Sequence, residues 1–496
     1  MKRAIGFFLT IIFLLVSITV MAESKKNGSF SYKIVNNETV VITGFDWITN
    51  GNQDIQIPQT IDGYTVTEIG EYAFSSKDVG MYGSIGENVT IILPKTITTI
   101  GEKAFFRTNI SSIIIPASVQ QICDGAFAGC RNIKFFNVES NNPIYTTIDG
   151  VLYNKQTKTL VAAPYSSTKV DIPDGIVSIG SYAFWGIDFG KINVKLPKSI
   201  KSIGSHAFEG CKFAWAHDYS YSFEFSNVEE IGDYAFANAY FADCYMTNVK
   251  YIGYRAFNGA NIIKWTAPKI VEIGDYAFAG VDIVGGRSAD LEFSGTLEKI
   301  GEGSFVGYDS VTPIKTIDLG KTKIQYIPER AFSYIQGSIE KIILPQTVLS
   351  IDNRAFYMTR NDYKTSISIN IPSSVKSIGD EAFYAEDGGK KVYWRIAIDP
   401  DNSKLTTIGD FAFYGIWLNP KEFRLPSGLK EIGDKAFYCH FSQLYLPSSV
   451  VKIGEELCIR TETVLEVASD SYAAIYATQN GYATVDADND TSWLND

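Results

Sequence analysis

The 496-residue sequence contains few of the side chains that carry metal and acid–base chemistry, with 3 histidines and 6 cysteines. His206 lies in the hexapeptide IGSHAF, distant in sequence from His217 and His440, and no H-E-x-x-H ligand pair is present. The sequence also has no G-x-S-x-G elbow and no glycine-rich phosphate loop. These absences favour a protein that is not an enzyme and that uses neither a metal nor a cofactor.

Positive charge and long apolar runs are scarce as well. Lys and Arg number 44 against 55 Asp and Glu, so the formal net charge is -11, and it becomes -13 when the two cations of residues 1–22 are removed. This charge disfavours a nucleic-acid partner. The one long apolar run, Ala4 to Val20, follows Met1-Lys2-Arg3 and precedes small residues, which predicts a signal peptide over 1–22, with a transmembrane anchor as the alternative. We therefore expect an exported chain, secreted or at the cell surface with the periplasm left open, and no membrane span in the mature chain.

The sequence instead repeats one hexapeptide, I-G-x-x-A-F, from end to end. Counting looser copies, 15 are present, and the shortest separation between two starts is 21 residues. Repeats of this length are typical of solenoids, in which each coil buries its apolar side chains only by stacking on its neighbours. The copies begin at Ile69, Ile100, Ile122, Ile179, Ile203, Ile231, Ile252, Ile273, Ile300, Ile327, Ile351, Ile378, Ile408, Ile432 and Ile453.

A second signature, apolar-x-apolar-Pro, precedes most of the hexapeptides. Alternation with a period of two predicts a strand, and proline, which cannot donate to a ladder, marks the strand's end. The two signatures together predict a β-rich solenoid of about 15 stacked coils of 21 to 30 residues. We assign an N-terminal cap to 23–54, the array to 55–463 with an inserted β-hairpin at about 146–165, and a C-terminal cap with an acidic tail to 464–496.

The same periodicity explains two sequence patterns that resemble reactive sites. The nucleophile pattern S-x-x-K occurs at Ser373, Ser427 and Ser449, always between a proline and I-G, which indicates a by-product of the repeat. Cys123 and Cys130 lie seven residues apart in ICDGAFAGC, but position 130 holds Ala, Val or Ile in other copies. We favour free core thiols at these positions, with a disulfide between the two cysteines as an open alternative and metal binding as the least favoured one.

The strand signature also assigns a row of side chains to the outside. The central residue of each strand should face solvent if its two apolar neighbours face the core. Within this row Ile92, Ile114 and Tyr445 are candidate partner contacts, against the simpler reading that they are ordinary strand formers. The row consists of Gln56, Ile92, Ile114, Asp171, Lys195, Glu224, Glu292, Asp318, Ile343, Asn370, Arg424, Tyr445 and Glu466.

An aromatic insertion, FAWAHDYSYS, provides a second candidate contact surface. Trp215, Tyr219 and Tyr221 could stack on a sugar or anchor a protein, although packing of the loop onto its own array is the plainer alternative.

These motifs resemble the BspA-like, Treponema-type leucine-rich repeat family of secreted and surface proteins. The family pattern, apolar-x-apolar-P followed by V-x-x-I-G-x-x-A-F-x-x-C, is matched over about Ile55 to Cys458, and the segments IDGVLYNKQTKTL and SYAAIYATQNGY are similar to recurring family features. The resemblance implies a leucine-rich-repeat solenoid and a non-catalytic, adhesin-like protein that binds an extracellular protein ligand such as a host matrix or surface protein. It brings no catalytic residues with it. A carbohydrate-binding accessory protein that uses the aromatic insertion loops to hold a glycan is the alternative.

Overall fold

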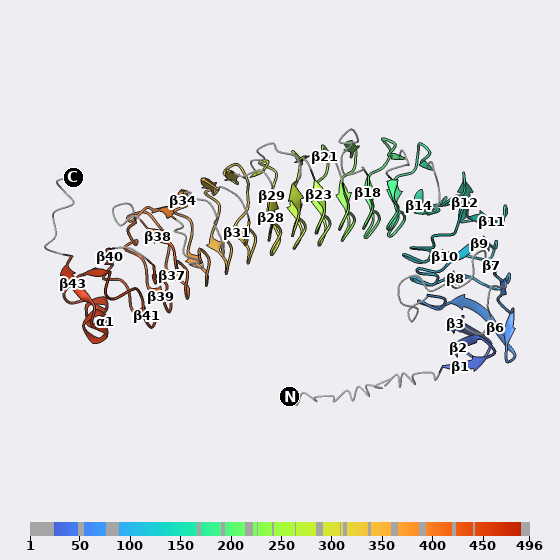
Figure 1. Cartoon of the computed structure of the whole chain (residues 1–496), viewed down its shortest axis with the longest axis horizontal. Helices are drawn as coiled ribbons and strands as arrows, with labels where there is room; N and C mark the ends of the chain where they lie inside the picture. Colours follow the sequence, from blue (N-terminus) through green and yellow to red (C-terminus); the bar gives the residue numbers. More distant parts are fainter. Residues whose placement is uncertain are drawn as a thin grey trace, which may run out of the picture.

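The computed structural model shows a long arched solenoid (Figure 1). It has about 14 turns with repeats about 24 residues apart and nearly no helix, which confirms the predicted β-solenoid. The structure describes residues 24–47, 54–75, 89–165, 170–189, 194–213, 222–225, 227–240, 243–262, 264–283, 291–307, 309–310, 315–335, 339–358, 366–385, 393–418, 423–439 and 442–487.

The strands that end at the motif isoleucine lie in three successive sheets along the array. In most steps Ile pairs with Ile in parallel, as Ile203 does with Ile231. The first sheet contains β1 (Lys25–Asn27), β2 (Phe30–Ile34), β3 (Thr39–Phe45), β5 (Thr60–Ile61), β6 (Tyr64–Ile69), β8 (Thr99–Ile100) and β10 (Gln121–Ile122). The second contains β12 (Tyr145–Ile148), β13 (Val151–Asn154), β14 (Thr159–Ala162), β16 (Ser178–Ile179), β18 (Ser202–Ile203), β20 (Glu230–Ile231), β22 (Tyr251–Ile252), β25 (Glu272–Ile273) and β28 (Lys299–Ile300). The third contains β31 (Tyr326–Ile327), β33 (Ser350–Ile351), β35 (Ser377–Ile378), β37 (Thr407–Ile408), β39 (Glu431–Ile432) and β41 (Lys452–Ile453).

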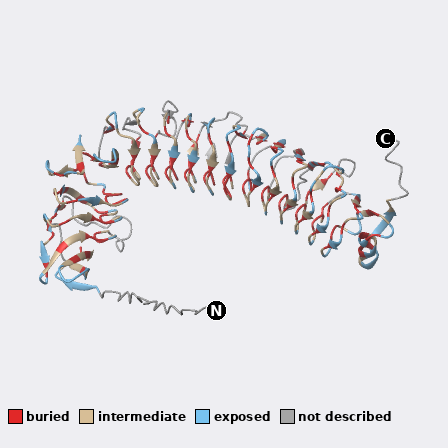
Figure 2. Ribbon diagram, turned by 180° about the vertical axis from the view of Figure 1, so that it is seen from behind, coloured by how far each residue is buried: buried red, intermediate tan, exposed pale blue. Residues whose placement is uncertain are grey.

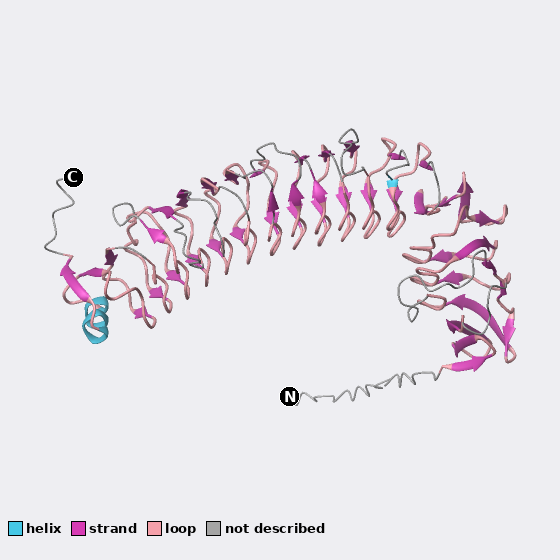
Figure 3. Cartoon of the chain, viewed as in Figure 1, coloured by secondary structure: helices cyan, strands magenta, loops and turns pink. Residues whose placement is uncertain are grey.

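The strands of the second signature form separate parallel sheets on another side of the coils (Figure 3). They are β4 (Ile55–Gln56), β7 (Val89–Ile92), β9 (Ile110–Ile115) and β11 (Asn137–Val138); β15 (Val170–Asp171) and β17 (Val194–Lys195); β19 (Ser222–Glu224), β21 (Asp243–Tyr245) and β24 (Lys264–Thr266); β27 (Leu291–Glu292), β30 (Thr316–Asp318), β32 (Lys341–Ile343), β34 (Ser366–Ile371), β36 (Tyr393–Ile398) and β38 (Trp417–Leu418); and β40 (Gln443–Leu446), β42 (Val464–Val467) and β43 (Ala483–Asp486). A small third line consists of β23 (Asn261–Ile262), β26 (Asp282–Ile283) and β29 (Asp309–Ser310).

The motif phenylalanines build the core as two ring stacks, one from Phe74 to Phe127 and one from Phe184 to Phe437. Phe305 is fully buried and lies 5.3 Å from Phe278 and 5.4 Å from Phe332, with ring planes within 4° of parallel. The motif Ile and Ala side chains are buried beside these stacks, so the buried residues form an interior line through every turn (Figure 2). Each coil therefore gains its apolar contacts from the coils before and after it.

The motif glycine is needed for close approach between coils. A Cβ added at Gly204 would lie 2.7 Å from the backbone nitrogen of Ser181 in the preceding coil. Gly204 does not have a positive φ, so the requirement here is space. This agrees with the sequence, in which Pro328 and Asp352 occupy the same position in two looser copies.

The turn after most motif strands is held by three backbone hydrogen bonds, which we call rungs. With the motif Ile as position 1, the N–H groups at positions 4, 6 and 8 donate to the carbonyl oxygens at positions 3, 5 and 7 of the next coil. Between coils 203 and 231 the rungs are His206 to Asp233 at 2.8 Å, Phe208 to Ala235 at 2.7 Å and Gly210 to Ala237 at 2.8 Å. The rungs satisfy backbone groups that the short strands leave unpaired.

The array is interrupted once, after β10. That strand is the edge of its sheet, and the antiparallel strands β12, β13 and β14 stand between it and β16, with Leu160 of β14 paired in parallel with Ile179. The buried apolar residues divide into two clusters at the same place, one over 32–162 and one over 151–482. The N-terminal coils bend away from the rest of the arch here (Figure 1).

The C-terminal end of the array is closed by helix α1 (Tyr472–Asn480) and β43. Ser471 caps the helix by accepting the N–H of Ala474, and Gly481 ends it in a left-handed conformation. The hydroxyl of Tyr476 donates to the carbonyl of Gly454 at 2.8 Å, which anchors the cap to the last coil. Within the part of the chain that the structure describes, no helix is long and apolar enough to cross a membrane.

Candidate interaction surfaces

The described residues show no gathering of metal ligands, since no three His, Cys, Asp or Glu side chains among them lie close enough to hold an ion. His206 is a packing residue. Its ring lies 4.4 Å from the ring of Tyr182 and 4.8 Å from that of Tyr234, and its Nδ1 is 2.6 Å from the carboxylate of Glu209.

All six cysteines are free thiols in the structure. Burial raises the pKa of Cys130 to about 12, and its Sγ donates to the carbonyl of Phe105 at 3.0 Å. Cys123 is only partly buried and accepts from the side-chain amide of Gln121 at 3.4 Å, and burial raises the pKa of its thiol too. A thiol with a raised pKa is a poor nucleophile at neutral pH, so neither cysteine is set up for chemistry.

The S-x-x-K copy at Ser449 is built into the contacts between coils. The Ser449 hydroxyl next to Pro447 donates to the carbonyl of Leu429 in the preceding coil at 2.6 Å, and the Lys452 ammonium is 3.3 Å from a carboxylate oxygen of Glu431. The serine is thus bonded to backbone and the lysine to a surface acid, and the two do not act on each other.

Ile92 and Ile114 face outward, with exposed fractions of 42% and 48%. They are direct register partners on β7 and β9, flanked by Gln56 of β4 and Asn137 of β11. Two exposed isoleucines side by side form a small apolar patch on an otherwise polar row.

Tyr445 lies at the opposite end of the arch, on β40, and is half-buried. The Arg424 guanidinium lies 5.2 Å from its ring centre and 3.6 Å from Glu466. The expectation that Glu466 faces solvent is wrong: the residue is only 6% exposed, because Gln443 donates to its carboxylate at 3.1 Å and Arg424 covers it. The structure therefore does not bring Tyr445 together with Ile92 and Ile114.

For the remaining residues of the outward row, the structure gives the exposure of some side chains and does not describe others. Gln56, Asp171, Glu292 and Asn370 are exposed, and Asp318, Ile343 and Arg424 are half-buried. The side chains of Lys195 and Glu224 lie outside the described part of the chain, as do Trp215, Tyr219 and Tyr221 entirely.

The structure also reveals a surface that the sequence reading missed. Five tyrosines from five successive coils lie ring against ring, with centres separated by 5.3, 4.8, 4.9 and 5.4 Å; the first pair is tilted and the other three pairs are stacked. We call this surface the tyrosine column; it consists of Tyr334, Tyr357, Tyr384, Tyr414 and Tyr438. Tyr334 is 44% exposed and the other four are half-buried, so the rings rest on the array and keep an open edge.

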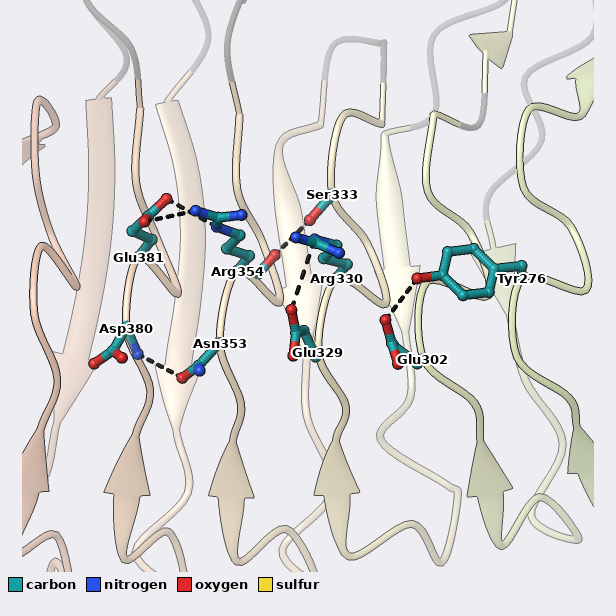
Figure 4. A network of polar contacts seen from close by, with 9 residues as sticks. All are labelled: Tyr276, Glu302, Glu329, Arg330, Ser333, Asn353, Arg354, Asp380 and Glu381. Carbon is teal, nitrogen blue, oxygen red and sulfur yellow. Dashed lines mark hydrogen bonds and ion pairs between the residues drawn. The ribbon is translucent and has the colours of Figure 1, made fainter.

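Charged side chains are fixed beside the tyrosine column. Arg354 donates two hydrogen bonds to Glu381, at 3.0 and 2.9 Å, and its guanidinium is 5.8 Å from the centre of the Tyr357 ring (Figure 4). The bidentate pair raises the pKa of Arg354 further and holds the side chain in one orientation. Lys435 lies 6.0 Å from the Tyr438 ring and 3.2 Å from Glu456. The column is thus a pre-ordered surface of aromatic and cationic groups.

Similar contacts between successive coils continue along the same region. Figure 4 shows the hydroxyl of Tyr276 donating to Glu302 at 2.6 Å and the N–H of Asp380 donating to the side chain of Asn353 at 2.8 Å. A signal for the column was present in the sequence, since four successive copies read AFY, at Phe356, Phe383, Phe413 and Phe437.

Comparison with known families gives one extensive match. The description "BspA type leucine rich repeat region (6 copies)" matches residues 49–163, 162–284, 287–393 and 361–471, which together are well over half of the chain. No match was found among curated proteins.

Several solved structures match the chain at low identity and low TM-score. A leucine rich cell surface protein from Faecalibacterium prausnitzii is 17% identical over 75% of this chain and 94% of its own, with a TM-score of 0.37. A leucine-rich repeat protein from Bacteroides ovatus is 16% identical over 93% and 99%, with a TM-score of 0.35. The pneumococcal vaccine antigen PcpA is 16% identical over 73% and 95%, with a TM-score of 0.25. At these scores the superpositions carry no argument about function.

Proposed function

The chain belongs to the BspA type leucine rich repeat family, and from this premise we propose that it is an exported, non-catalytic surface protein that binds a protein ligand. The observation that carries the proposal is the tyrosine column. Tyr and Arg are the residue types most enriched where protein interfaces gain their affinity. The column presents a tyrosine in each of five successive coils, with Arg354 beside Tyr357.

The state of the column before binding supports this use. A tyrosine held between two stacked rings has already lost most of its rotamer freedom, so less entropy is lost when a partner covers it. The same holds for Arg354, which is fixed by its two bonds to Glu381. A flat partner surface with exposed carboxylates or apolar side chains would complement the ring edges and the neighbouring cations.

Two further surfaces belong to the proposal as additional contacts. Ile92 and Ile114 provide an apolar patch near the N-terminal end, and Tyr445 provides an aromatic ring near the other end. Contacts spread over a long array allow weak patches to add through multivalency.

Export of the chain is supported by the sequence of residues 1–22, with a cationic start, an apolar stretch and small residues before the expected cleavage site. The leucine rich protein from Faecalibacterium prausnitzii is described as a cell surface protein. We place this chain in the same setting, secreted or at the cell surface.

The test uses the chain without residues 1–22, applied to a panel of immobilised host matrix proteins and to a glycan array. Saturable binding to one protein, lost in the double variant Tyr384→Ser and Tyr414→Ser, is the expected result. Tyr251→Ser with Tyr326→Ser is the matched control, because these tyrosines are 44% and 54% exposed and lie outside the column. Protein binding that both double variants retain equally would remove the column from the proposal. Selective glycan binding without protein binding would favour the carbohydrate-binding alternative and its aromatic loop at Trp215, Tyr219 and Tyr221.

A further inference from the structure

The interruption after β10 leaves backbone donors without acceptors. At every other step between successive motif copies, the rungs from positions 4 and 6 are formed. In the coil that begins at Ile122, the donors at positions 4, 6 and 8 are the N–H groups of Gly125, Phe127 and Gly129, and none of them has an acceptor among the described residues. Three N–H groups that face the same direction are therefore unsatisfied.

The facing coil shows the complementary vacancy. Its carbonyls at positions 3, 5 and 7 belong to Ser181, Ala183 and Trp185, and the preceding coil normally donates to all three. Here only Ala183 has a donor, the N–H of Ala163 at 2.9 Å, while the carbonyls of Ser181 and Trp185 have none among the described residues. The inserted segment thus fills the middle of the gap and leaves both flanks open.

A cavity of about 200 Å³ lies between these two walls, and we call it the junction cavity. It is lined by residues 122–130 of the interrupted coil, by residues 180–183, Trp185 and Ile187 of the facing coil, and by inserted residues that include Asn154, Thr157 and Thr159. Beside it the hydroxyl of Tyr145 on β12 accepts the N–H of Ile122 at 2.8 Å, which links the interrupted coil to the inserted strands.

Two glycines give the cavity its aromatic cover. A Cβ at Gly125 would lie 3.1 Å from Cδ2 of Tyr182, and one at Gly129 would lie 3.0 Å from Cζ3 of Trp185. Both glycines have positive φ, of 65° and 74°. Glycine at these positions lets the Tyr182 and Trp185 rings fold over the interrupted coil, where Lys103 and Arg107 lie 4.9 and 5.0 Å from their centres.

The other end of the array shows the fold satisfying one such donor from its own cap. In the last coil, the N–H of Cys458, at position 6, donates to the hydroxyl of Tyr482 at 3.4 Å, and the N–H of Leu457, at position 5, donates to that of Tyr476 at 3.3 Å. The cap thus supplies oxygen atoms in place of a further coil. At the junction cavity, no described side chain does this for Gly125, Phe127 or Gly129.

We propose that the junction cavity binds a short peptide segment in an extended conformation. Alternate carbonyls of the peptide accept from Gly125, Phe127 and Gly129, and its N–H groups donate to Ser181 and Trp185. The choice of a peptide follows from the rungs, in which the three donors are met by carbonyls of three alternate residues of one chain. A single small anion reaches only part of this row. The site is separate from the tyrosine column, so it stands or falls independently of the proposed protein-binding role.

Hydrogen exchange followed by mass spectrometry tests the proposal on the whole chain, with acetyl-Gly-Ser-Gly-Ser-Gly-amide as the probe. The peptide should slow exchange in segment 122–130 by about tenfold or more at the unsatisfied amides. The matched segment 203–211, IGSHAFEGC, has all three rungs and should not change. Sodium acetate is the second arm, and protection by acetate without protection by the peptide would mean an anion site and overturn the proposal.

A blocking variant and a second readout make the result decisive. Thr159→Tyr places a ring at the cavity wall and should abolish the protection, and tyrosine is compatible with this position because Tyr251 and Tyr326 occupy it in other coils. Ser377→Tyr is the same change in a coil distant from the cavity and should have no effect. If Thr159→Tyr does not fold, the amide signals of Gly125 and Gly129 in ¹⁵N-glycine-labelled wild-type protein decide the question. Both signals should move on titration with the peptide. Unchanged signals, or no exchange protection in the wild-type protein, would mean that the cavity holds water alone and would refute the site.

Discussion

Substitution of one core phenylalanine should damage the array locally. Phe305 is fully buried, with Phe278 and Phe332 stacked on its two faces at 5.3 and 5.4 Å and Phe293 at its side at 5.5 Å. Phe305→Ala should lower the free energy of unfolding by about 3–5 kcal/mol, the usual loss for a buried phenylalanine. The stacked pairs account for about 0.5–1.5 kcal/mol each of that loss.

The location of the damage is the sharper part of this prediction. Because each coil contacts only its neighbours, hydrogen exchange should rise in the coils of Ile273, Ile300 and Ile327 and stay near wild type in the coils of Ile179 and Ile432. Urea unfolding gives the magnitude and exchange mass spectrometry gives the location. Tyr326→Ala is the control, because this side chain is 54% exposed and its loss should change stability by about 0.5 kcal/mol or less. A uniform rise in exchange along the whole chain would refute the nearest-neighbour account of the array.

Three further outcomes follow from the contacts between coils. Gly204→Val should destabilise the protein by about 1–3 kcal/mol in thermal or urea unfolding, because its Cβ would meet the backbone nitrogen of Ser181 at 2.7 Å. Glu229→Gln should flatten the acid side of the curve of stability against pH. The hydrogen bond from Lys250 lowers the pKa of Glu229, so this carboxylate stabilises the fold above its ordinary pKa of 4.5 and loses that effect as the pH falls through the lowered pKa. An unchanged curve would contradict the ion pair. Cys130 should resist a thiol reagent at pH 8 in the native state and react on unfolding, since burial raises its pKa to about 12, and fast native labelling would contradict that burial.

Much of the fold could be predicted because every copy of the repeat places the same kinds of side chain in the same environments. The I-G-x-x-A-F copies fix which side chains are buried, which residue needs space and where the strands lie, and the structure agrees at Phe305 and Gly204. The outward position of Ile92 and Ile114 follows from alternation in a strand with a buried face.

The surfaces were harder to predict because they depend on how coils align. The tyrosine column requires that Tyr357, Tyr384, Tyr414 and Tyr438 occupy one position after the motif Phe and that the coils stack in register. Glu466 was expected on the surface, but its burial depends on Arg424 and Gln443 from earlier coils, which alternation within one strand cannot reveal.

The junction cavity was harder still to predict from the sequence. ICDGAFAGC differs from most sister segments by having Cys123 in place of the motif glycine and Gly125 two residues later, which does not by itself reveal a gap. The gap arises because β12 to β14 enter the ladder after Ile122, so that the next full coil begins at Ile179.

The affinity of the tyrosine-column variant for the protein ligand tests the central claim most directly. The triple variant Tyr357→Ser, Tyr384→Ser and Tyr414→Ser removes three stacked rings from the outside of the array and leaves the phenylalanine core in place. Measured by biolayer interferometry against the matrix protein selected from the panel, this variant should bind about 30-fold more weakly or worse, which corresponds to about 2 kcal/mol. An affinity within about twofold of wild type, with unchanged thermal stability, would contradict the assignment of the column as the binding surface.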